Sequence, residues 1–458
     1  MTERHVVVLG GGISGLSAAY ALRRTLPDVR VTLVEESPRL GGKLYTGELG
    51  GASVETGADN WLARVPEATA LARNVGLGPD LVSPATGDAY VWVGTRLRRL
   101  PQGTVRGVPG RLTSLARTRV LSPAGLLRAA AEPWLPGRPV TDPTTVGALV
   151  RRRLGRQATD RLVEPLLGGV YAGRADALDL DAAAPDLAAL ARGSRSLVRA
   201  ARRRAADAPP APGPVFHSVR GGLSTLVQAV ATHARADVLT RTRAATVERL
   251  AHGFRVTLAG GRALIADAVV VATPAKPAAR LLDLLAKDAA DALRGIEYAD
   301  VAVVGLAYRH GTAAPALPPG SGVLVPPGQR LTKAVTFYGQ KWPAAATPGT
   351  TLLRASVGRA GEPPPDDDDA LVRRVHRELA PLLRLPGMPY DAFVARWHDG
   401  LPQYALGHGA LVERVRAALP NGVAVAGAAY EGVGIAACVR SGEAAAARVA
   451  EHLRARGE

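Results

Sequence analysis

Apolar positions near the start of the chain predict a strand, a helix and a second strand. Residues 5–9 (HVVVL) are apolar and largely β-branched, which is typical of a buried parallel strand. Residues 14–26 carry apolar side chains at helical spacing, and residues 29–35 (VRVTLVE) again form an apolar run. This β-α-β order predicts an open parallel sheet.

The hydrophobic pattern then changes along the chain. Residues 113–205 are rich in Leu, Ala and Arg at helical spacing, so we expect a helical insertion, followed by a proline-rich connector at 207–214. A helix is expected at 221–233, strands within 236–271 and a β-rich region at 296–360.

Two later segments have alternative interpretations. The acidic residues 366–369 could hold a metal or form an acidic tail, but a helical pattern follows at 370–383, which favours a helix N-terminus. Residues 422–439 contain one charged residue, Glu431, yet their glycines argue against a membrane span. We expect instead a strand, a glycine turn and a final helix over 441–456, in a cytoplasmic protein.

Composition narrows the classes of protein. A chain of 458 residues exceeds one compact core, so two or three domains are expected. Its formal charge of +17 favours anionic ligands or an anionic membrane surface. The basic residues are scattered and match no nucleic-acid-binding signature, so no nucleic-acid partner is expected. The single cysteine, Cys438, excludes an intrachain disulfide, and no metal site is expected.

A glycine motif lies between the first strand and the first helix. Gly10, Gly12 and Gly15 have the G-x-G-x-x-G spacing. Such glycines allow a tight turn, close approach of the backbone to a pyrophosphate, and close packing of helix on strand. Glu35 ends the second strand, where an acid can bind ribose hydroxyls and disfavours the 2′-phosphate of NADP. The sequence therefore predicts a dinucleotide site.

Further glycine-rich turns favour FAD over NAD. Residues 39–43 (RLGGK) and 55–58 (ETGA) resemble the second glycine-rich turn of the flavin amine oxidase superfamily. Residues 269–274 (VVVATP) resemble its return strand, and residues 425–435 form a strand, a glycine turn and a helix start. Backbone N–H groups in such a turn can stabilise negative charge on a reduced flavin. The residues expected to contact FAD are Gly10, Gly11, Gly12, Ile13, Ser14, Gly15, Glu35, Glu36, Arg39, Gly41, Gly42, Lys43, Gly57, Ala58, Asp59, Asn60, Ala244, Ala272, Thr273, Gly427, Val433, Gly434 and Ile435.

Longer stretches resemble one family within this superfamily, the bacterial coproporphyrinogen III and protoporphyrinogen IX oxidases. They include residues 55–77, 162–187 (LVEPLLGGVYAGRADALDLDAAAPDL), 401–408 and 430–442 (YEGVGIAACVRSG), and the resemblance spans nearly the whole chain. It implies an α/β chain, α+β overall, with three domains. The expected divisions are a Rossmann-like FAD-binding domain at 1–80, 213–280 and 404–458, a β-rich substrate domain at 81–112 and 281–403, and a helical domain at 113–212.

The resemblance also implies an activity. It predicts an oxygen-dependent enzyme with noncovalent FAD that oxidises a porphyrinogen to a porphyrin in haem biosynthesis, by three two-electron hydride transfers that release hydrogen peroxide. Because the meso-carbon hydrogens are already hydridic, the protein mainly positions the substrate, and no catalytic acid or base is named. The implied partners are the porphyrinogen, molecular oxygen and the ferrochelatase that takes the product; peripheral membrane contact stays open.

Candidate substrate residues follow from the same resemblance. Arg64 stands at the mouth of the implied cavity, where it could bind a propionate. Gly168, Gly169 and Tyr171 are substrate contacts or, on an equally good interpretation, packing residues. Lys341, in the run QKWP, could approach the flavin, but the end of a strand is the simpler expectation.

The substrate and the chemistry leave alternatives. Positive charge favours coproporphyrinogen III, with four propionates, over protoporphyrinogen IX, with two. A covalent flavin link at Cys438 is an alternative to a small buried residue. A flavin amine oxidase and a non-catalytic flavin-binding scaffold are the remaining functional alternatives.

Overall fold

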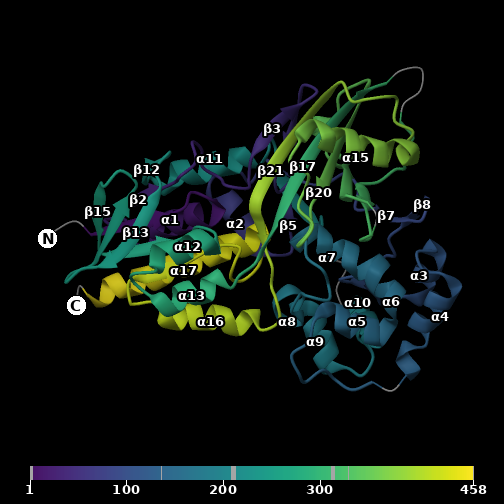
Figure 1. Cartoon of the computed structure of the whole chain (residues 1–458), viewed down its shortest axis with the longest axis horizontal. Helices are drawn as coiled ribbons and strands as arrows, with labels where there is room; N and C mark the ends of the chain where they lie inside the picture. The colour runs from purple at the N-terminus through teal and green to yellow at the C-terminus, as the bar shows by residue number, and fades with distance from the viewer. Residues whose placement is uncertain (1–3, 136, 208–212, 311–314, 329, 457–458) are drawn as a thin grey trace.

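A computed structural model provides the structure of the chain. It describes residues 4–135, 137–207, 213–310, 315–328 and 330–456 (Figure 1). Five residues of the expected proline-rich connector, 208–212, lie outside these ranges.

A five-stranded parallel sheet forms the centre of one half of the molecule. Its order is β12 (Asp237–Leu239), β2 (Arg30–Val34), β1 (His5–Leu9), β16 (Ala268–Val271) and β22 (Val423–Val425). The predicted strand at 5–9 is confirmed, and the predicted strand at 29–35 is confirmed with its end at Val34. Neighbours in this sheet come from distant parts of the sequence, since β1 pairs with both β2 and β16.

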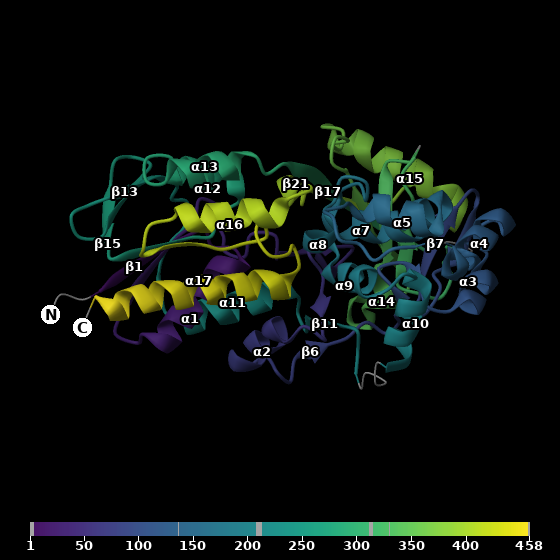
Figure 2. The same ribbon diagram turned by 90° about the horizontal axis from the view of Figure 1, so that it is seen from below.

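Helices cover both faces of this sheet (Figure 2). One face packs against α1 (Ile13–Thr25), α2 (Pro66–Asn74), α11 (Leu223–Ala234) and α17 (Ile435–Ala455), and the other against α12 (Ala275–Leu282), α13 (Lys287–Arg294) and α16 (His408–Ala418). The predicted helices at 14–26 and 221–233 are confirmed. Residues 281–296 were expected with the β-rich domain, but Leu282, Ala289 and Leu293 belong to the core of this sheet.

The C-terminal helix begins earlier than predicted. We expected it at residue 441, whereas α17 begins at Ile435, directly after Gly434. The small residues that follow let it lie tightly on α1, because a Cβ on Gly442 would be 2.2 Å from the carbonyl oxygen of Ser14. Residues 422–439 are thus a strand, a turn and the start of a helix.

Smaller sheets border this half. They are β13 (Ala244–Arg249), β14 (Phe254–Leu258) and β15 (Ala263–Ala266); β5 (Trp61–Leu62), β11 (Phe216–Val219) and β6 (Leu81–Val82); and the hairpin β3 (Thr46–Leu49) and β4 (Ala52–Glu55).

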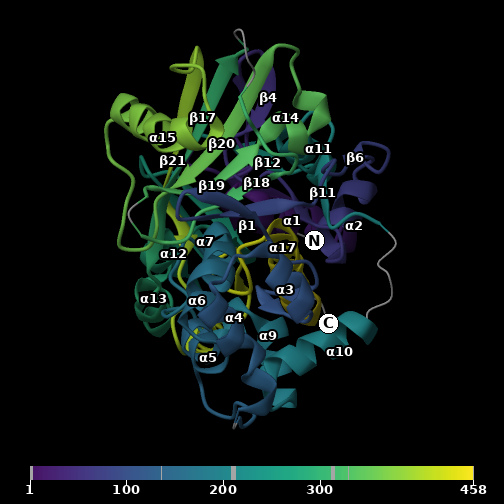
Figure 3. The same cartoon turned by 90° about the vertical axis from the view of Figure 1, so that its right-hand side faces the viewer.

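A seven-stranded sheet forms a second region, at the top in Figures 1 and 3. Its order is β21 (Asp391–Pro402), β17 (Tyr298–Arg309), β20 (Thr350–Val357), β19 (Thr332–Phe337), β18 (Gly322–Leu324), β7 (Ala89–Val93) and β8 (Arg96–Arg99), and α14 (Tyr338–Lys341) and η3 (Pro343–Ala345) follow β19. Helix α15 (Asp368–Leu383) packs on it through Leu371, Val375 and Leu379. The Asp367 side chain caps α15 by accepting from the N–H of Ala370, which confirms the predicted helix start.

The third region is helical and has a core of its own (Figure 3). It contains the short hairpin β9 (Thr104–Val105) and β10 (Val108–Pro109), then α3 (Leu112–Thr118), α4 (Pro123–Ala130), η1 (Glu132–Trp134), α5 (Val146–Leu154), α6 (Arg156–Ala158), the π-helical turn η2 (Thr159–Val163), α7 (Glu164–Tyr171), α8 (Leu180–Ala183), α9 (Pro185–Gly193) and α10 (Leu197–Asp207). The predicted helical insertion is confirmed. Among the described residues, no helix is long and apolar enough to cross a membrane.

Candidate cofactor and substrate site

The first glycine turn joins β1 to α1 at the carboxyl end of the parallel sheet. Gly10 has φ +105°, and a Cβ there would be 2.8 Å from the carbonyl oxygen of Ala272. A Cβ on Gly15 would be 1.9 Å from the carbonyl oxygen of Gly10, so only glycine allows α1 to lie this close to the strand. A Cβ on Gly12, by contrast, would have no protein atom within 4 Å. Gly10 and Gly15 therefore allow the tight turn and the close helix packing that the motif predicts, and Gly12 leaves free space beside the turn.

Glu35 connects the end of β2 to this turn. One of its carboxylate oxygens accepts from the backbone N–H of Gly11 at 2.7 Å, and the other accepts from the N–H of Ser37 at 2.8 Å. A carboxylate has about four lone-pair positions, so it can still accept from two further hydroxyls. The N–H of Thr242 donates to the carbonyl oxygen of Glu35, and Ala244 lies two residues further along the chain. Glu36 is exposed.

The second glycine turn lies directly against the first. The N–H of Gly41 donates to the carbonyl oxygen of Gly11 at 2.8 Å, and Gly12 and Gly41 form a parallel bridge. Gly41 and Gly42 both have positive φ, at +99° and +56°. Two segments that are thirty residues apart in sequence thus lie directly against each other.

Two basic side chains belong to the second turn. The Arg39 guanidinium donates to the carbonyl oxygen of Gly42 at 2.9 Å and lies 4.2 Å from the ring centre of Tyr45. Lys43 is half-buried beside the C-terminal turn, and burial lowers the pKa of its ammonium. Arg39 thus stabilises the turn itself, whereas Lys43 is the better placed of the two to meet an anion.

The segment around Gly57 completes this part of the site. A Cβ on Gly57 would be 2.0 Å from the carbonyl oxygen of Lys43, and the N–H of Ala58 donates to that oxygen at 3.1 Å. Arg354 on β20 donates to the carbonyl oxygens of Glu55 and Gly57. The seven-stranded sheet is in this way tied to the glycine turns.

Asp59 and Lys341 form a largely buried ion pair with 2.6 Å between Oδ2 and Nζ. Burial alone would raise the pKa of the Asp59 carboxyl, but the Lys341 ammonium and the Arg354 guanidinium bring it below its usual value. Asn60 donates to the other oxygen of Asp59 at 2.6 Å. Lys341 is the last residue of the short helix α14, so the prediction that it ends a strand is wrong. Through its ion pair with Asp59, it does lie near the segment that contains Gly57.

Glu55 is a buried carboxyl that the sequence did not single out. Its Oε1 accepts from the N–H of Leu223 at 2.7 Å and from the hydroxyl of Thr46 at 3.0 Å, while Oε2 has no partner. Burial raises the pKa of this carboxyl to about 7. Glu55 therefore joins the start of α11 to the β3–β4 hairpin, with a proton that titrates near neutrality.

The return strand and the C-terminal turn lie beside the first glycine turn. The N–H of Ala272 donates to the carbonyl oxygen of Leu9 at 2.7 Å, and the buried hydroxyl of Thr273 has no partner. Gly427 has φ +135°, and a Cβ on Gly427 or Gly434 would have no protein atom within 4 Å. Val433 and Ile435 flank Gly434; Ile435 is buried. Cys438 is buried, in agreement with the interpretation that it is a small buried residue. Burial raises the pKa of its thiol.

The predicted substrate element, α7, is joined to the C-terminal turn by Tyr404. The Tyr404 hydroxyl donates to the carbonyl oxygen of Ala428 at 2.6 Å, and its ring centre lies 5.4 Å from that of Tyr171. The N–H of Ala360, just beyond β20, donates to the carbonyl oxygen of Ala172 at 2.7 Å. The end of α7 is therefore held between the cofactor turns and the seven-stranded sheet.

The individual substrate candidates differ in their surroundings. A Cβ on Gly168 would have no atom within 4 Å, and Gly169 is exposed. The buried Tyr171 hydroxyl donates to the carbonyl oxygen of Ala183 at 3.2 Å, inside the helical core. Arg64 is exposed between β5 and α2. The structure thus gives Gly168 free space and places the Tyr171 hydroxyl in the helical core, and it shows no hydrogen bond or ion pair between Arg64 and α7 within the described residues.

Lys333 is a second buried group that sequence reasoning missed. It lies on β19 where the register with β20 shifts, and its side-chain ammonium forms no hydrogen bond or ion pair with the described residues. Burial, together with Arg359 and Arg354, lowers its pKa to about 7. The only sequence signal was a lysine within an otherwise apolar strand.

These observations fit a bound dinucleotide. Gly12, Gly427 and Gly434 expose backbone where a side chain would find free space, and the Thr273 hydroxyl is a buried group without a partner. Glu35 keeps acceptor capacity beside Gly11. Glu35, Gly12 and Thr273 follow the carboxyl ends of the parallel strands β2, β1 and β16, where open α/β sheets bind their ligands.

Comparison with known protein families decides the class of cofactor. The profile of the family described as "Flavin containing amine oxidoreductase" matches residues 13–450. This chain belongs to that family. As a member, it is a flavin-dependent oxidoreductase.

Two full-length relatives have the same name. The chain is 39% identical to the coproporphyrinogen III oxidase of Mycobacterium leprae, over 99% of both chains. It is 34% identical to the coproporphyrinogen III oxidase of Bacillus subtilis, over 98% of this chain and 99% of that protein. A crystal structure titled as a putative protoporphyrinogen oxidase from Exiguobacterium is 30% identical, with a TM-score of 0.89 over 98% of this chain and 99% of that one.

Proposed function

We propose that this chain is a coproporphyrinogen III oxidase that binds FAD noncovalently and uses molecular oxygen as acceptor. The observation that supports this proposal best is the position of α7, which Tyr404 holds against the C-terminal flavin turn. Full-length relatives at 34% and 39% identity with this name support the same substrate.

The residues of the chain would act mainly by positioning. Glu35 would bind the ribose hydroxyls, Gly12 would bring its backbone to the pyrophosphate at the start of α1, and Gly427 and Gly434 would face the ring system. When bound, FAD supplies a two-electron acceptor that molecular oxygen regenerates. Gly168 leaves room for a flat substrate beside this turn, and Arg64 would bind a propionate at the entrance.

No side chain has to remove a proton in this scheme. Each two-electron step takes a hydrogen with its electron pair from a meso carbon and releases one proton to solvent; over the three steps, two of these protons come from pyrrole N–H groups and the third from the fourth meso carbon. Three such steps remove six hydrogens and consume three molecules of oxygen. The rate then depends on how closely the meso carbon is placed. We propose that a ferrochelatase takes the product.

Protoporphyrinogen IX is the second candidate substrate. A chloroplast protoporphyrinogen oxidase 1 from Arabidopsis thaliana is 29% identical over 94% of this chain and 85% of that protein. Solved amine oxidases, such as a cyclohexylamine oxidase from Brevibacterium oxydans at 18% identity and a TM-score of 0.69, share the fold alone.

The test compares both porphyrinogens with the purified flavoprotein in air. We expect porphyrin fluorescence to appear faster with coproporphyrinogen III, and about three molecules of hydrogen peroxide for each porphyrin, as two-electron flavin chemistry requires. A faster rate with protoporphyrinogen IX would reverse the substrate order. Bound flavin without turnover of either compound would overturn the proposal and leave an amine oxidase or a scaffold.

A further inference from the structure

Lys333 is the extra residue of a β-bulge at the start of β19. The register between β19 and β20 shifts from Thr332 to Ala334, which leaves Lys333 between two paired residues. Its carbonyl oxygen accepts from the N–H of Val325 at 2.9 Å, so its backbone is held to the segment that follows β18. The residue is only 2% exposed. The bulge therefore fixes a lysine side chain inside the protein.

The charges that act on Lys333 are positive. Two guanidinium groups, those of Arg354 and Arg359, lie near its ammonium and disfavour its charged form. Arg359 is itself 5% exposed and donates to the carbonyl oxygen of Val325 at 3.0 Å, and Arg354 donates to backbone carbonyl oxygens of residues 55–57. We call Lys333, Arg354 and Arg359 the Lys333 cluster. Within the part of the chain that the structure describes, none of the three is in an ion pair.

The acids around this cluster have other partners. Glu378, on α15, accepts from the two backbone N–H groups just before Lys333. Glu164, on α7, accepts from a backbone N–H at 2.7 Å, and Glu362 pairs with Arg174. A buried charge is costly unless it is paired and hydrogen-bonded. The Lys333 cluster thus has the positive charge to receive an anion, but its own chain does not supply one among the described residues.

Space for a ligand lies beside the cluster, at α7, which packs against β18 and β19. Gly168 is buried, yet a Cβ on it would have no atom within 4 Å. A Cβ on the neighbouring Gly169 would be 3.9 Å from Leu324, which pairs with Ala334 across β18 and β19. Ala334 directly follows Lys333 in the sequence. The Lys333 cluster therefore lies next to the place that the proposed function gives to the porphyrinogen.

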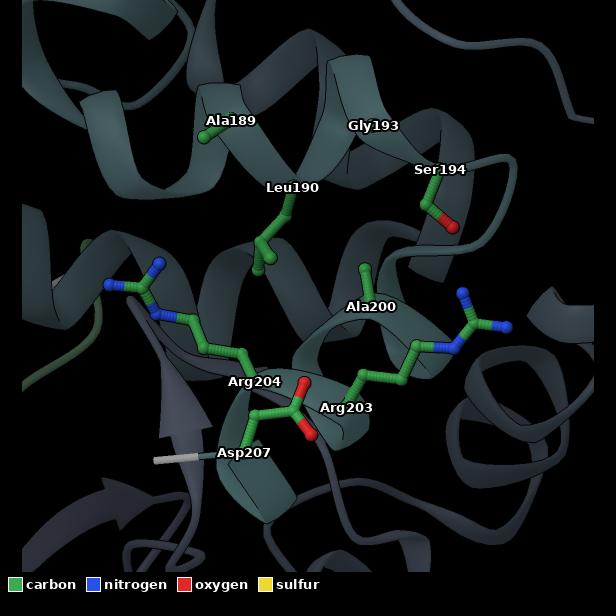
Figure 4. A pocket seen from close by; sticks show the side chains of 8 residues that line it. All are labelled: Ala189, Leu190, Gly193, Ser194, Ala200, Arg203, Arg204 and Asp207. Carbon is green, nitrogen blue, oxygen red and sulfur yellow. The ribbon is translucent and has the colours of Figure 1, made fainter. Parts of the chain in front are cut away.

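A pocket between α9 and α10 is the rival site for an anion (Figure 4). Its volume is about 550 Å³; Arg203 and Arg204 line it, and Asp207 lies between them. All three residues are exposed, so water can satisfy their charges. Its cations are not held away from water, in contrast to Lys333.

We propose that the Lys333 cluster binds a propionate at the inner end of the site and thereby selects coproporphyrinogen III; this inference rests on the proposed function for its class of substrate. Charge-assisted hydrogen bonds make a carboxylate the matching ligand for an ammonium beside guanidinium groups. Coproporphyrinogen III carries a propionate on every pyrrole ring, so one faces inward in any orientation. Protoporphyrinogen IX carries its two propionates on one edge. When that edge faces the exposed Arg64, vinyl groups face Lys333.

Charge-removing variants test the role of Lys333. K333M, and K333Q as a second neutral variant, should raise the KM for coproporphyrinogen III about tenfold, because a hydrogen bond between charged groups is lost. The KM for protoporphyrinogen IX should change less than about twofold. K287M removes an exposed lysine on α13 and should behave like the wild type. The unfolding temperature of K333M should stay the same or rise, since an apolar residue replaces a buried cation without an acid.

Binding of the porphyrin product gives a readout that needs no turnover. Free Lys333, with a pKa of about 7, has lost most of its proton at pH 8, and a bound carboxylate favours the charged form again. Coproporphyrin III should therefore bring about one more proton into its complex with the wild type than into its complex with K333M. The guanidinium groups stay protonated throughout. Calorimetric titration at pH 8 in buffers of different ionisation enthalpy measures this difference.

The two proposals fail separately. If the wild type oxidises neither porphyrinogen, the proposed function is wrong, and calorimetry alone decides whether Lys333 binds a carboxylate. With an active wild type, equal KM values for K333M and K287M, or equal proton uptake by the wild type and K333M, would overturn the role of Lys333. A similar loss with both porphyrinogens and a lower unfolding temperature would assign Lys333 to folding. Weaker binding of coproporphyrin III by R203M/R204M, but not by K333M, would place the carboxylate in the rival pocket.

Discussion

The backbone N–H of Gly41 donates to the carbonyl oxygen of Gly11 at 2.8 Å. This bond joins the turn that follows β1 to the turn that follows β2, so the two cannot move independently. Because glycines give both turns little side-chain bulk, their backbones can lie closer together than residues with side chains would allow. The predictions below test this site and the residues that hold it.

Gly12→Ala and Gly15→Ala separate cofactor binding from folding. A Cβ on Gly12 has free space, and the φ of −69° suits alanine, so the flavin-free protein should keep its stability while flavin binds about tenfold more weakly or worse. A Cβ on Gly15 would be 1.9 Å from the Gly10 carbonyl oxygen and should destabilise by about 3 kcal/mol. Flavin titration and urea unfolding measure both. Equal effects of the two changes would contradict this distinction.

Removal of Lys341 should leave Asp59 as a buried charge without its closest cation. Lys341→Met should lower the free energy of unfolding by about 3 kcal/mol, since the pair is 13% and 15% exposed with 2.6 Å between Nζ and Oδ2. Asp59→Asn combined with Lys341→Met should recover part of this loss. Urea unfolding of the two single variants and the double variant gives the coupling. Additive effects would show that the pair contributes nothing.

Glu55 makes stability depend on pH. Its folded pKa of about 7 lies above the usual 4.5, so the folded state binds the proton more tightly and stability is lost as pH rises from about 4.5 to about 7. Glu55→Gln keeps the acceptor for Leu223 without the charge. The variant should gain up to about 3 kcal/mol over the wild type between pH 5 and pH 8. Glu48→Gln, at an exposed position on β3, is the control. The prediction is contradicted if the free energy of unfolding of Glu55→Gln depends on pH in the same way as that of the wild type.

Tyr171→Phe distinguishes packing from substrate contact. The hydroxyl donates to the Ala183 carbonyl oxygen at 3.2 Å within the helical core. Its removal should cost about 1 kcal/mol of stability and leave the KM for porphyrinogen unchanged. Steady-state kinetics and urea unfolding measure the two effects. A raised KM at unchanged stability would assign the hydroxyl to the substrate instead.

Local motifs in the sequence predicted the geometry of the first glycine turn well. Gly10, Gly12 and Gly15 act over six residues, so their spacing alone indicates strand, turn and helix. The position of Glu35 could be predicted equally well, because the second strand of the unit ends beside the first. These residues are tied to the geometry of one β-α-β unit, which the hydrophobic pattern already reveals.

Contacts between distant parts of the chain could not be predicted from the sequence. Asp59 and Lys341 are separated by 282 residues, and Arg354 and Gly57 by 297. Such pairs depend on how the seven-stranded sheet meets the glycine turns, which no local pattern records. The start of α17 at Ile435 agrees with the helix start expected after the glycine turn, whereas the start expected at residue 441 was six residues late.

The discontinuous parallel sheet has a consequence for biosynthesis. Strand β1 pairs with β16, and β16 in turn pairs with β22, which comes more than four hundred residues after β1. While the ribosome is still adding these later segments, the N-terminal β-α-β unit has only part of its core and would need shielding from aggregation. Residues 423–455 must leave the exit tunnel before α17 can close over α1, so capture of the yellow cofactor should be one of the last events in maturation.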